Sequence, residues 1–213
     1  MSLALARAAS SLVPLASAEG ERRWGEAAAG RAAAAHVRAA WQRQRTRTTC
    51  GPCSVAVCAR ALGLLEVTEA DVLRRGVAAG VVREADVLKT GVTLAEAASI
   101  AEAAGLAARV VYAPTTEEAV EAFCRELARG EGCAIALNYH MTALGQGSGT
   151  LRGHVSPLGA YHQQSRSALV MDVWLEETEP VWAPVEQLME SMRGVDDASG
   201  LQRGYAVLQR SRG

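Results

Sequence analysis

The chain has 213 residues, of which 49% are hydrophobic, and a formal net charge of -1. This length suffices for one globular domain with a substantial core, and the near-neutral charge argues against nucleic acid or an anionic membrane as the main partner. No apolar run reaches the roughly 18 residues that a membrane-spanning helix needs.

Five cysteines, an odd number without regular spacing, do not form the pattern of a disulfide framework. Free thiols persist in a reducing compartment, so we expect a cytoplasmic protein. The first 18 residues contain the Ala, Leu and Ser typical of targeting peptides, but Arg7 interrupts their apolar stretch. We therefore expect a single domain over residues 1–213, with a targeting role for the first residues as the weaker alternative.

Residues 19–41 are rich in alanine and predict one or two helices that pack on the core through Trp24 and Trp41. A solvated helix face accounts for most of the arginines in and just after this region. The alternative is that some of them attract an anionic substrate, because clustered positive charge near a cleft raises the local anion concentration. The arginines are Arg31, Arg38, Arg43, Arg45 and Arg47.

Capped helices and one strand are predicted up to residue 129. Thr68 and Thr93 can each cap a helix, and Glu96, three residues after Thr93, completes a capping box. The Val- and Ala-rich run after Gly105 is typical of a strand, and Thr116 can cap the helix that follows it. The expected elements are helices at 68–75, 84–88, 93–104 and 116–129 and a strand at 106–112.

The remaining residues favour strands. Two apolar runs after the Gly-rich loop at 145–153 predict a hairpin, and a third apolar run precedes that loop. The expected elements are strands at 133–139, 154–161, 168–174 and 205–209 and a helix at 185–192. The sequence therefore predicts an α+β domain with a helical first half and an antiparallel sheet in the second.

Cys50 is the candidate nucleophile. It stands where a cationic segment meets a run of helix formers, with Pro52 in the first turn and Gly63 where the helix would end. The positive partial charge of a helix N-terminus, together with Arg45 and Arg47, would stabilise the thiolate, which is the nucleophilic form.

A nucleophilic cysteine needs a base, an orienting group and an oxyanion-binding donor. His154 and Asp172 follow Cys50 in that order, and Asp172 stands in an apolar run that predicts a buried strand. A buried carboxylate is costly unless it is paired, so a hydrogen bond between Asp172 and His154 is physically reasonable. The amide of Gln44, with the backbone N–H of Cys50, could form the oxyanion hole.

The tetrapeptide Cys50-Gly51-Pro52-Cys53 also occurs in thioredoxin-like redox proteins. That fold needs a strand directly before the motif, whereas the preceding segment here is rich in Arg and Thr. Cys-x-x-Cys alone lacks the second ligand pair of a zinc site. The spacing does motivate a second hypothesis, that a Cys50–Cys53 disulfide switches the nucleophile off under oxidation.

Short motifs recur in a fixed order over nearly the whole chain, from about residue 12 to about residue 210. They are Ser17-Ala18-Glu19-Gly20, Glu26-Ala27, Gln44, Cys50-Gly51, Tyr139-His140, Gln146, the run from His154 to Tyr161, the run from Ala168 to Val173, Val181-Trp182-Ala183-Pro184 and Arg203-Gly204-Tyr205. This set resembles the catalytic domain of phytochelatin synthase, a family of papain-like cysteine transpeptidases.

The resemblance implies a papain-like fold, with the nucleophile on a helical lobe and the His and Asp on a sheet lobe. It also implies that the Cys50 thiolate attacks the Cys–Gly amide of glutathione, that His154 transfers the proton, that Asp172 orients the imidazole and that Gln44 stabilises the oxyanion. The γ-glutamylcysteinyl group then passes to a second glutathione or to water. No tightly bound cofactor is implied, and cadmium or zinc would enter as a thiolate complex of the substrate.

The resemblance further implies substrate contacts late in the domain. Asp196 matches an acidic residue and Arg203 an arginine that recognise the γ-glutamyl end, as ammonium and carboxylate partners. Gly153 and Arg152, which directly precede His154, are further candidates. The implied partner is glutathione or a related thiol peptide, and pairing of two chains as a homodimer is left open.

Two departures from the family pattern affect the acceptor side. The sequence Leu175-Glu176-Glu177 stands where the family usually has Arg and Lys, which should weaken binding of a second, anionic glutathione. The loop from Gln146 to His154 is also longer than usual. An enzyme with the same acyl chemistry but another donor or amine acceptor is therefore an alternative, and a thiol-rich metal-binding module is a weaker one.

Overall fold

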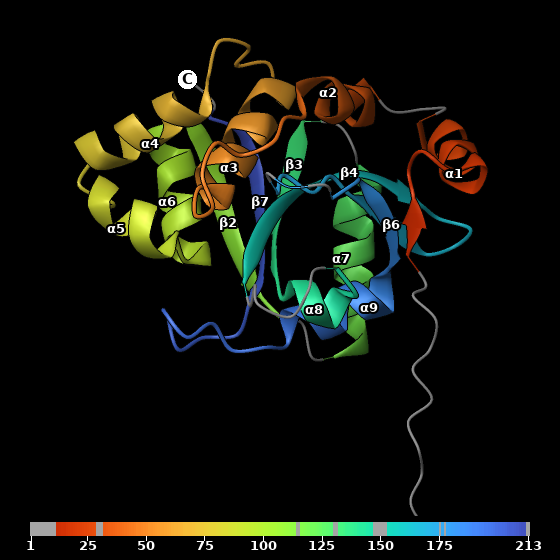
Figure 1. The fold of residues 1–213 in the computed structure, drawn as a ribbon. Coiled ribbons are helices and arrows are strands. Elements are labelled where there is room, and N and C mark those ends of the chain that lie inside the picture. The colour runs from red at the N-terminus through yellow and green to blue at the C-terminus, as the bar shows by residue number, and fades with distance from the viewer. Residues whose placement is uncertain are drawn as a thin grey trace, which may run out of the picture.

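The computed structural model describes residues 12–28, 32–113, 116–129, 132–146, 153–174, 176 and 178–211. Its centre is a seven-stranded antiparallel sheet with the strand order β1-β6-β5-β4-β3-β7-β2 (Figure 1). The strands are β1 (Val13–Pro14), β2 (Leu106–Tyr112), β3 (Cys133–Tyr139), β4 (His154–His162), β5 (Ser167–Val170), β6 (Val181–Pro184) and β7 (Gly204–Arg210).

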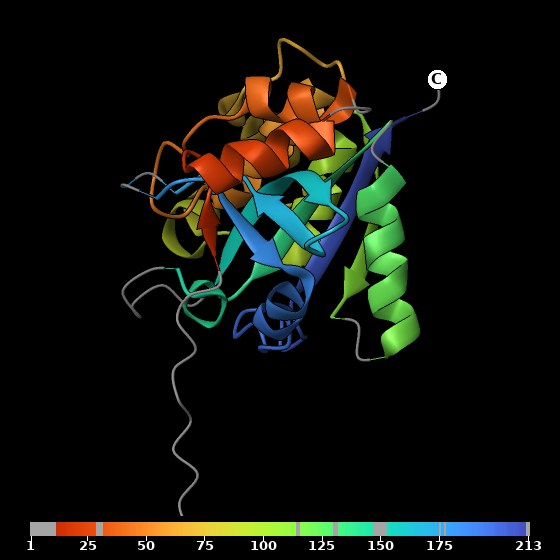
Figure 2. The same ribbon diagram turned by 90° about the vertical axis from the view of Figure 1, so that its right-hand side faces the viewer.

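Helices cover both faces of this sheet, as the two views in Figures 1 and 2 show. The helices on one side are α1 (Ala18–Ala28), α2 (Ala32–Ala40), α3 (Cys50–Ala61), α4 (Glu69–Ala78), α5 (Glu84–Thr90) and α6 (Leu94–Ala103). Those on the other side are α7 (Glu117–Arg129), α8 (Met141–Leu144) and α9 (Val185–Met192). None of the helices in the described ranges is long and apolar enough to cross a membrane.

Strand β3, which lies inside the sheet between β4 and β7, shows how the core is divided. Its alternate residues Ala134 and Ala136 pack with α3 and α6, whereas Ile135 and Leu137 pack with α7 and α9. Successive side chains of a strand point to opposite faces, so small residues face one helical layer and large residues the other. Small side chains let α3 lie close over β3 and β4, which brings the start of that helix next to the start of β4.

The helix ends predicted from short sequence motifs are confirmed. Thr68 and Thr93 each form a complete capping box, with Asp71 and Glu96 as the reciprocal partners. Gly63 follows α3 with a φ of 90°, a left-handed conformation that glycine adopts without steric cost.

Other predictions need correction. The short elements β1, β6 and α8 were not predicted from the sequence, and the strand predicted at 168–174 is shorter, because β5 ends at Val170. Asp172 therefore lies beyond the strand, in an irregular segment. The reason is tertiary, because main-chain groups of this segment are bonded outside the sheet, as when Gln44 N donates to Val173 O at 2.7 Å.

Candidate active site

Cys50 is the first residue of α3 and is partly exposed, whereas the residues from Gly51 to Ala59 are buried. The preceding Thr49 does not cap the helix with its side chain, because its hydroxyl is turned to the carbonyl of Thr46 at 3.3 Å. The first N–H groups of α3 are thus left without a side-chain cap near the thiol. This is the helix-terminus environment that favours a thiolate.

His154 opens β4 and is joined to both Cys50 and Asp172. Its Nε2 lies 2.8 Å from Asp172 Oδ1, and the same oxygen accepts a hydrogen bond from Trp174 N at 2.9 Å. Cys50 and His154 each shift the pKa of the other, so the thiol lies beside the imidazole, and Nδ1 is the ring nitrogen that Asp172 leaves free for it. Asp172 is fully buried and His154 is 3% exposed. The three predicted side chains therefore form one continuous series.

The electrostatics of this series favour an ion pair. Burial would raise the pKa of the Cys50 thiol, but the hydrogen bond and positive charge of His154 lower that pKa below its ordinary value. Burial would lower the pKa of His154, but Asp172 and Cys50 raise it to about 9. Burial opposes the charge of Asp172 as well, yet His154 keeps its pKa below the usual value. All three shifts favour the thiolate–imidazolium pair over the neutral thiol and imidazole.

Two aromatic rings flank the imidazole edge to face. The rings of Tyr139 and His154 lie 5.7 Å apart at 74°, and those of His154 and Trp174 lie 6.0 Å apart at 83°. The hydroxyl of Tyr139 donates to Gln146 Oε1 at 2.9 Å, and all of these residues are buried. The rings exclude water from the His–Asp hydrogen bond. The sequence alone indicated no role for these rings, although Tyr139 and Gln146 belong to the motifs that carry the family resemblance.

Gln44 is 3% exposed in the segment between α2 and α3. Its Nε2 donates to Thr46 O at 2.6 Å, and its Oε1 accepts no hydrogen bond among the described residues. An amide nitrogen carries two hydrogens, so one remains for an oxyanion at Cys50. This supports Gln44 as an oxyanion donor, which stays a prediction.

The second cysteine of the tetrapeptide faces another way. Cys53 Sγ lies against Gln42, at 3.7 Å from Nε2 and 3.8 Å from the carbonyl, and burial raises the pKa of this thiol. All five cysteines are free, and a Cys50–Cys53 disulfide would require both thiols to turn from their present partners. Oxidative switching stays a prediction. In the described part of the chain no group of three His, Cys, Asp or Glu side chains could hold a metal ion.

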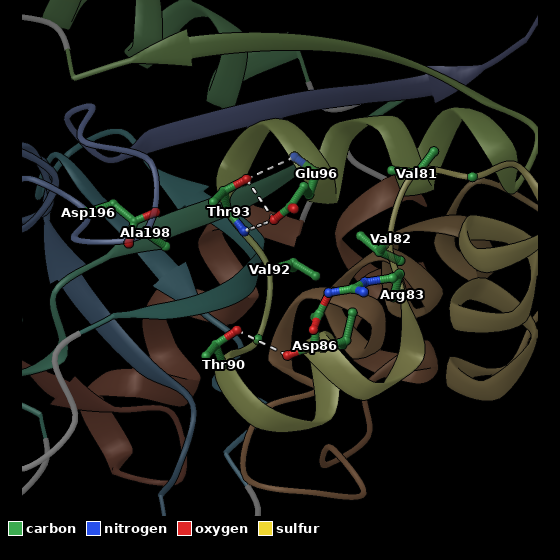
Figure 3. Close-up of a pocket in the computed structure, with 13 residues that line it drawn as sticks. Val81, Val82, Arg83, Asp86, Thr90, Val92, Thr93, Glu96, Asp196 and Ala198 are labelled. Atoms are coloured by element: carbon green, nitrogen blue, oxygen red, sulfur yellow. Dashed lines mark hydrogen bonds and ion pairs between the residues drawn. The ribbon is translucent and has the colours of Figure 1, made fainter.

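A pocket of about 370 Å³ lies between the connection from α5 to α6 and the loop after α9. Asp196 and Ala198 border it on one side, and Arg83 with Asp86 on the other (Figure 3). Its wall reaches the nucleophile's helix, because Val92 packs so closely on Gly51 that an added Cβ there would lie 2.2 Å from Cγ2. The predicted residue Asp196 thus lines a pocket adjoining the start of α3.

Arg203 packs on Gly153, the residue before His154, and is 5% exposed. Its Nη1 donates to Asn138 Oδ1 at 2.9 Å and its Nη2 to Asp196 Oδ1 at 3.4 Å, while Nε has no partner among the described residues. A Cβ on Gly153 would lie 2.4 Å from Nη1, so the guanidinium needs a glycine before His154. Asn138, a buried polar residue in an apolar strand, went unnoticed in the sequence. Another predicted contact, Arg152, lies outside the described residues.

Comparison with known proteins agrees with this geometry. The sequence model of the phytochelatin synthase family matches residues 4–205. The chain belongs to the phytochelatin synthase family. Similar curated proteins are glutathione gamma-glutamylcysteinyltransferase 1 from Triticum aestivum, 32% identical over 56% of this chain and 24% of the relative, and glutathione gamma-glutamylcysteinyltransferase from Schizosaccharomyces pombe, 30% identical over 56% of this chain and 28% of the relative. Another, glutathione gamma-glutamylcysteinyltransferase 1 from Lotus japonicus, is 39% identical over 38% of this chain and 15% of the relative.

The matched part of each of these family members is therefore less than a third of its length. Membership of the family confirms the resemblance on which the catalytic assignments rest. The relatives' own activity is carried over to this chain below as a proposal.

Proposed function

We propose that this protein is a cysteine-dependent acyltransferase or peptidase that cleaves the Cys–Gly amide of glutathione, or of a glutathione conjugate, through a γ-glutamylcysteinyl thioester on Cys50. The observation that carries the proposal is the series of Cys50, His154 and Asp172, with His154 hydrogen-bonded to Asp172 and electrostatically coupled to Cys50, in a chain of the phytochelatin synthase family. The relatives are named for γ-glutamylcysteinyl transfer from glutathione, which is a reaction of this kind.

The fold we assign to this activity is papain-like. Its support is that the nucleophile opens a helix, that the base opens a strand of the antiparallel sheet, and that the acid follows another strand of that sheet. We also assign the activity to one catalytic domain over residues 1–213.

In the first half of the reaction, the Cys50 thiolate attacks the carbonyl carbon of the cysteinyl residue and forms a C–S bond. The carbonyl oxygen becomes an oxyanion, for which Gln44 Nε2 and the Cys50 N–H are the proposed donors. When the C–N bond breaks, the His154 imidazolium gives its proton to the amine of the departing glycine. Asp172 holds the imidazole in the orientation that this transfer needs.

In the second half, the neutral His154 takes a proton from the acceptor, which is water or the amine of a second glutathione. The acceptor attacks the thioester carbonyl, the C–S bond breaks, and Cys50 leaves as a thiolate beside a renewed imidazolium. Hydrolysis yields γ-glutamylcysteine, and transfer to glutathione lengthens the peptide.

The donor's γ-glutamyl end carries an ammonium and a carboxylate, for which Asp196 and Arg203 are the proposed partners. Asp196 lines the pocket, and Arg203 packs on Gly153 immediately before the base. The weak contact of 3.4 Å between the two side chains can be exchanged for stronger bonds to the substrate.

The acceptor side is less cationic than the family pattern predicts. Glu176 binds Arg47 at 2.8 Å, with both side chains more than half exposed. An arginine that could attract the second anionic glutathione is thus partly neutralised. We therefore expect water to compete with glutathione as acceptor.

Mass spectrometry of the intact protein after incubation with glutathione, with and without cadmium, tests the function. We expect a γ-glutamylcysteinyl adduct on Cys50, release of glycine, and loss of both in Cys50→Ser. Cys133→Ser is the matched control, because Cys133 is partly exposed and lies on β3 away from the helix start. Release of glycine from the Cys50→Ser protein, or no adduct on a reactive Cys50, would overturn the proposal.

A further inference from the structure

Residues 41–44 hold the main chain that carries the catalytic acid. They donate hydrogen bonds to three consecutive carbonyls, those of residues 172–174. The bonds run from Trp41 Nε1 to Asp172 O (2.9 Å), from Gln44 N to Val173 O (2.7 Å) and from Arg43 Nη1 to Trp174 O (2.9 Å). Arg43 Nη1 also contacts the carbonyl of Glu176.

Neither partner in this contact belongs to a helix or strand. Helix α2 ends at Ala40 and strand β5 ends at Val170, so neither segment's course is set by a regular backbone ladder. Two of the three donors are side chains. The path of residues 172–174 therefore depends on the side chains of Trp41 and Arg43, which lie 131 residues away in sequence from their acceptors.

The two segments carry opposite halves of the catalytic apparatus. Residues 172–174 place the carboxylate of Asp172 on His154, and the N–H of Trp174 donates to that carboxylate. The segment 41–44 ends in Gln44, the proposed oxyanion donor. Holding one segment against the other thus fixes the acid and the oxyanion donor relative to each other.

Arg43 is exposed, and the sequence favoured a solvated role for it. Burial therefore does not explain the bonds that its guanidinium makes. Its guanidinium lies 5.5 Å above the ring of Trp41, so the two donors are packed on each other. This stacking and the bonds to the carbonyls of Trp174 and Glu176 hold the cation in place. The contacts of Arg43 therefore indicate a role other than the general attraction of anions.

We propose that Trp41 and Arg43 are positioning residues, which hold Asp172 toward His154 and Gln44 toward the thiol. The proposal rests on the cysteine mechanism proposed above but not on the identity of the acyl donor. Misplacing catalytic groups by about 1 Å can cost about 10²-fold in rate. We expect Arg43→Ala to lower kcat by about 10- to 100-fold with little change in KM.

A measurement without substrate tests the same point. The titratable groups that face the imidazole are Cys50 from α3, Asp172 after β5 and Tyr139 from β3. If Asp172 is displaced, the imidazolium loses support, and the Cys50 pKa rises. The pH dependence of alkylation by iodoacetamide reports this rise, because burial raises the pKa of each of the other four thiols.

Arg38→Ala is the matched comparison, because it removes one positive charge from the end of α2, where the guanidinium lies over the ring of Trp24 and pairs with Glu21 at 2.9 Å. We expect Arg43→Ala and Trp41→Phe each to move the alkylation profile to higher pH, and Arg38→Ala to leave it unmoved. Trp41→Phe keeps a ring but loses the donor to Asp172 O, so it tests the proposal even if Arg43→Ala does not fold. Arg43→Lys, which retains a charged donor, should restore part of kcat.

The proposal is overturned if folded Arg43→Ala and Trp41→Phe proteins alkylate with the wild-type pH profile. It is equally overturned if Arg43→Ala and Arg38→Ala raise KM alike and leave kcat unchanged, since that result would show only lost attraction of an anion. The alkylation measurement uses no glutathione, so it can be interpreted even if glutathione is not a substrate. The positioning proposal and the proposed function can therefore fail separately.

Discussion

The side chain of Asp172 has no exposed surface, and His154 Nε2 and Trp174 N both bond to its Oδ1. Its charge is tolerated because His154 faces it at 2.8 Å. The same interaction raises the pKa of His154 to about 9, so the imidazole is protonated below that pH. The carboxylate therefore decides the charge of the base as well as its orientation.

Asp172→Asn separates these two effects. Asparagine keeps an oxygen that can accept from Nε2 but removes the charge, so the pKa of His154 should fall from about 9. A base that loses its proton at lower pH moves the basic limb of the kcat profile to lower pH. We expect this shift together with a loss of about 10²-fold in kcat, measured by glycine release across pH.

The control for this substitution is Asp196→Asn, which removes a carboxylate from the pocket wall but not from the imidazole. It should raise KM and leave the basic limb in place. A wild-type basic limb in Asp172→Asn would contradict the assignment of Asp172.

Among the secondary-structure elements, α6 illustrates local control of the pocket. Its capping box closes the N-terminus, with Glu96 Oε2 accepting from Thr93 N at 2.8 Å and Glu96 N donating to Thr93 Oγ1 at 3.2 Å. Both residues also line the pocket (Figure 3). The box therefore fixes the pocket wall on the side of the nucleophile's helix.

Thr93→Ala should lower the free energy of unfolding by about 1 kcal/mol, because the N-cap acceptor is lost. Urea denaturation measures the change. Thr90→Ala is the control, since Thr90 lines the same pocket but ends α5, and its hydroxyl donates only to Asp86 O at 3.0 Å. Equal losses in the two variants would argue against the capping box as the cause.

In the molecule as a whole, the attachment of α1 to the sheet depends on Trp182. This residue of β6 is fully buried, and its Nε1 donates to Gly20 O at 3.0 Å. An added Cβ on Gly20 would lie 2.0 Å from Pro14 O, so helix α1 and strand β1 pack backbone to backbone. Helix, first strand and β6 therefore form one closely packed edge of the fold.

Trp182→Ala should cost about 3–5 kcal/mol of stability, because a large buried ring and a hydrogen bond are lost together. Trp24→Ala, which removes a partly exposed ring of α1, is the comparison and should cost less. Thermal or urea unfolding of the two variants measures both losses of stability. Similar losses for the two would show that α1 is not held mainly through Trp182.

The sequence alone was sufficient to predict the features that depend on a short stretch of the chain. Thr68 and Thr93 cap their helices through bonds to residues three positions away, and β3 lies at its predicted bounds. Cys50 at the start of α3 was predictable for the same reason, since composition and Gly63 mark both ends of that helix. The pairing of His154 with Asp172 followed from the cost of a buried charge and from the family resemblance.

Only the tertiary structure could decide contacts between distant segments. In the tertiary structure β5 ends before Asp172, and Arg43 donates a hydrogen bond to Trp174 O instead of being only solvated. Asn138 accepts a hydrogen bond from Arg203. The tertiary structure also sets Tyr139 and Trp174 against the imidazole. Capping and helix formation are encoded within three or four residues, whereas these contacts join groups up to 131 positions apart and depend on how the layers pack.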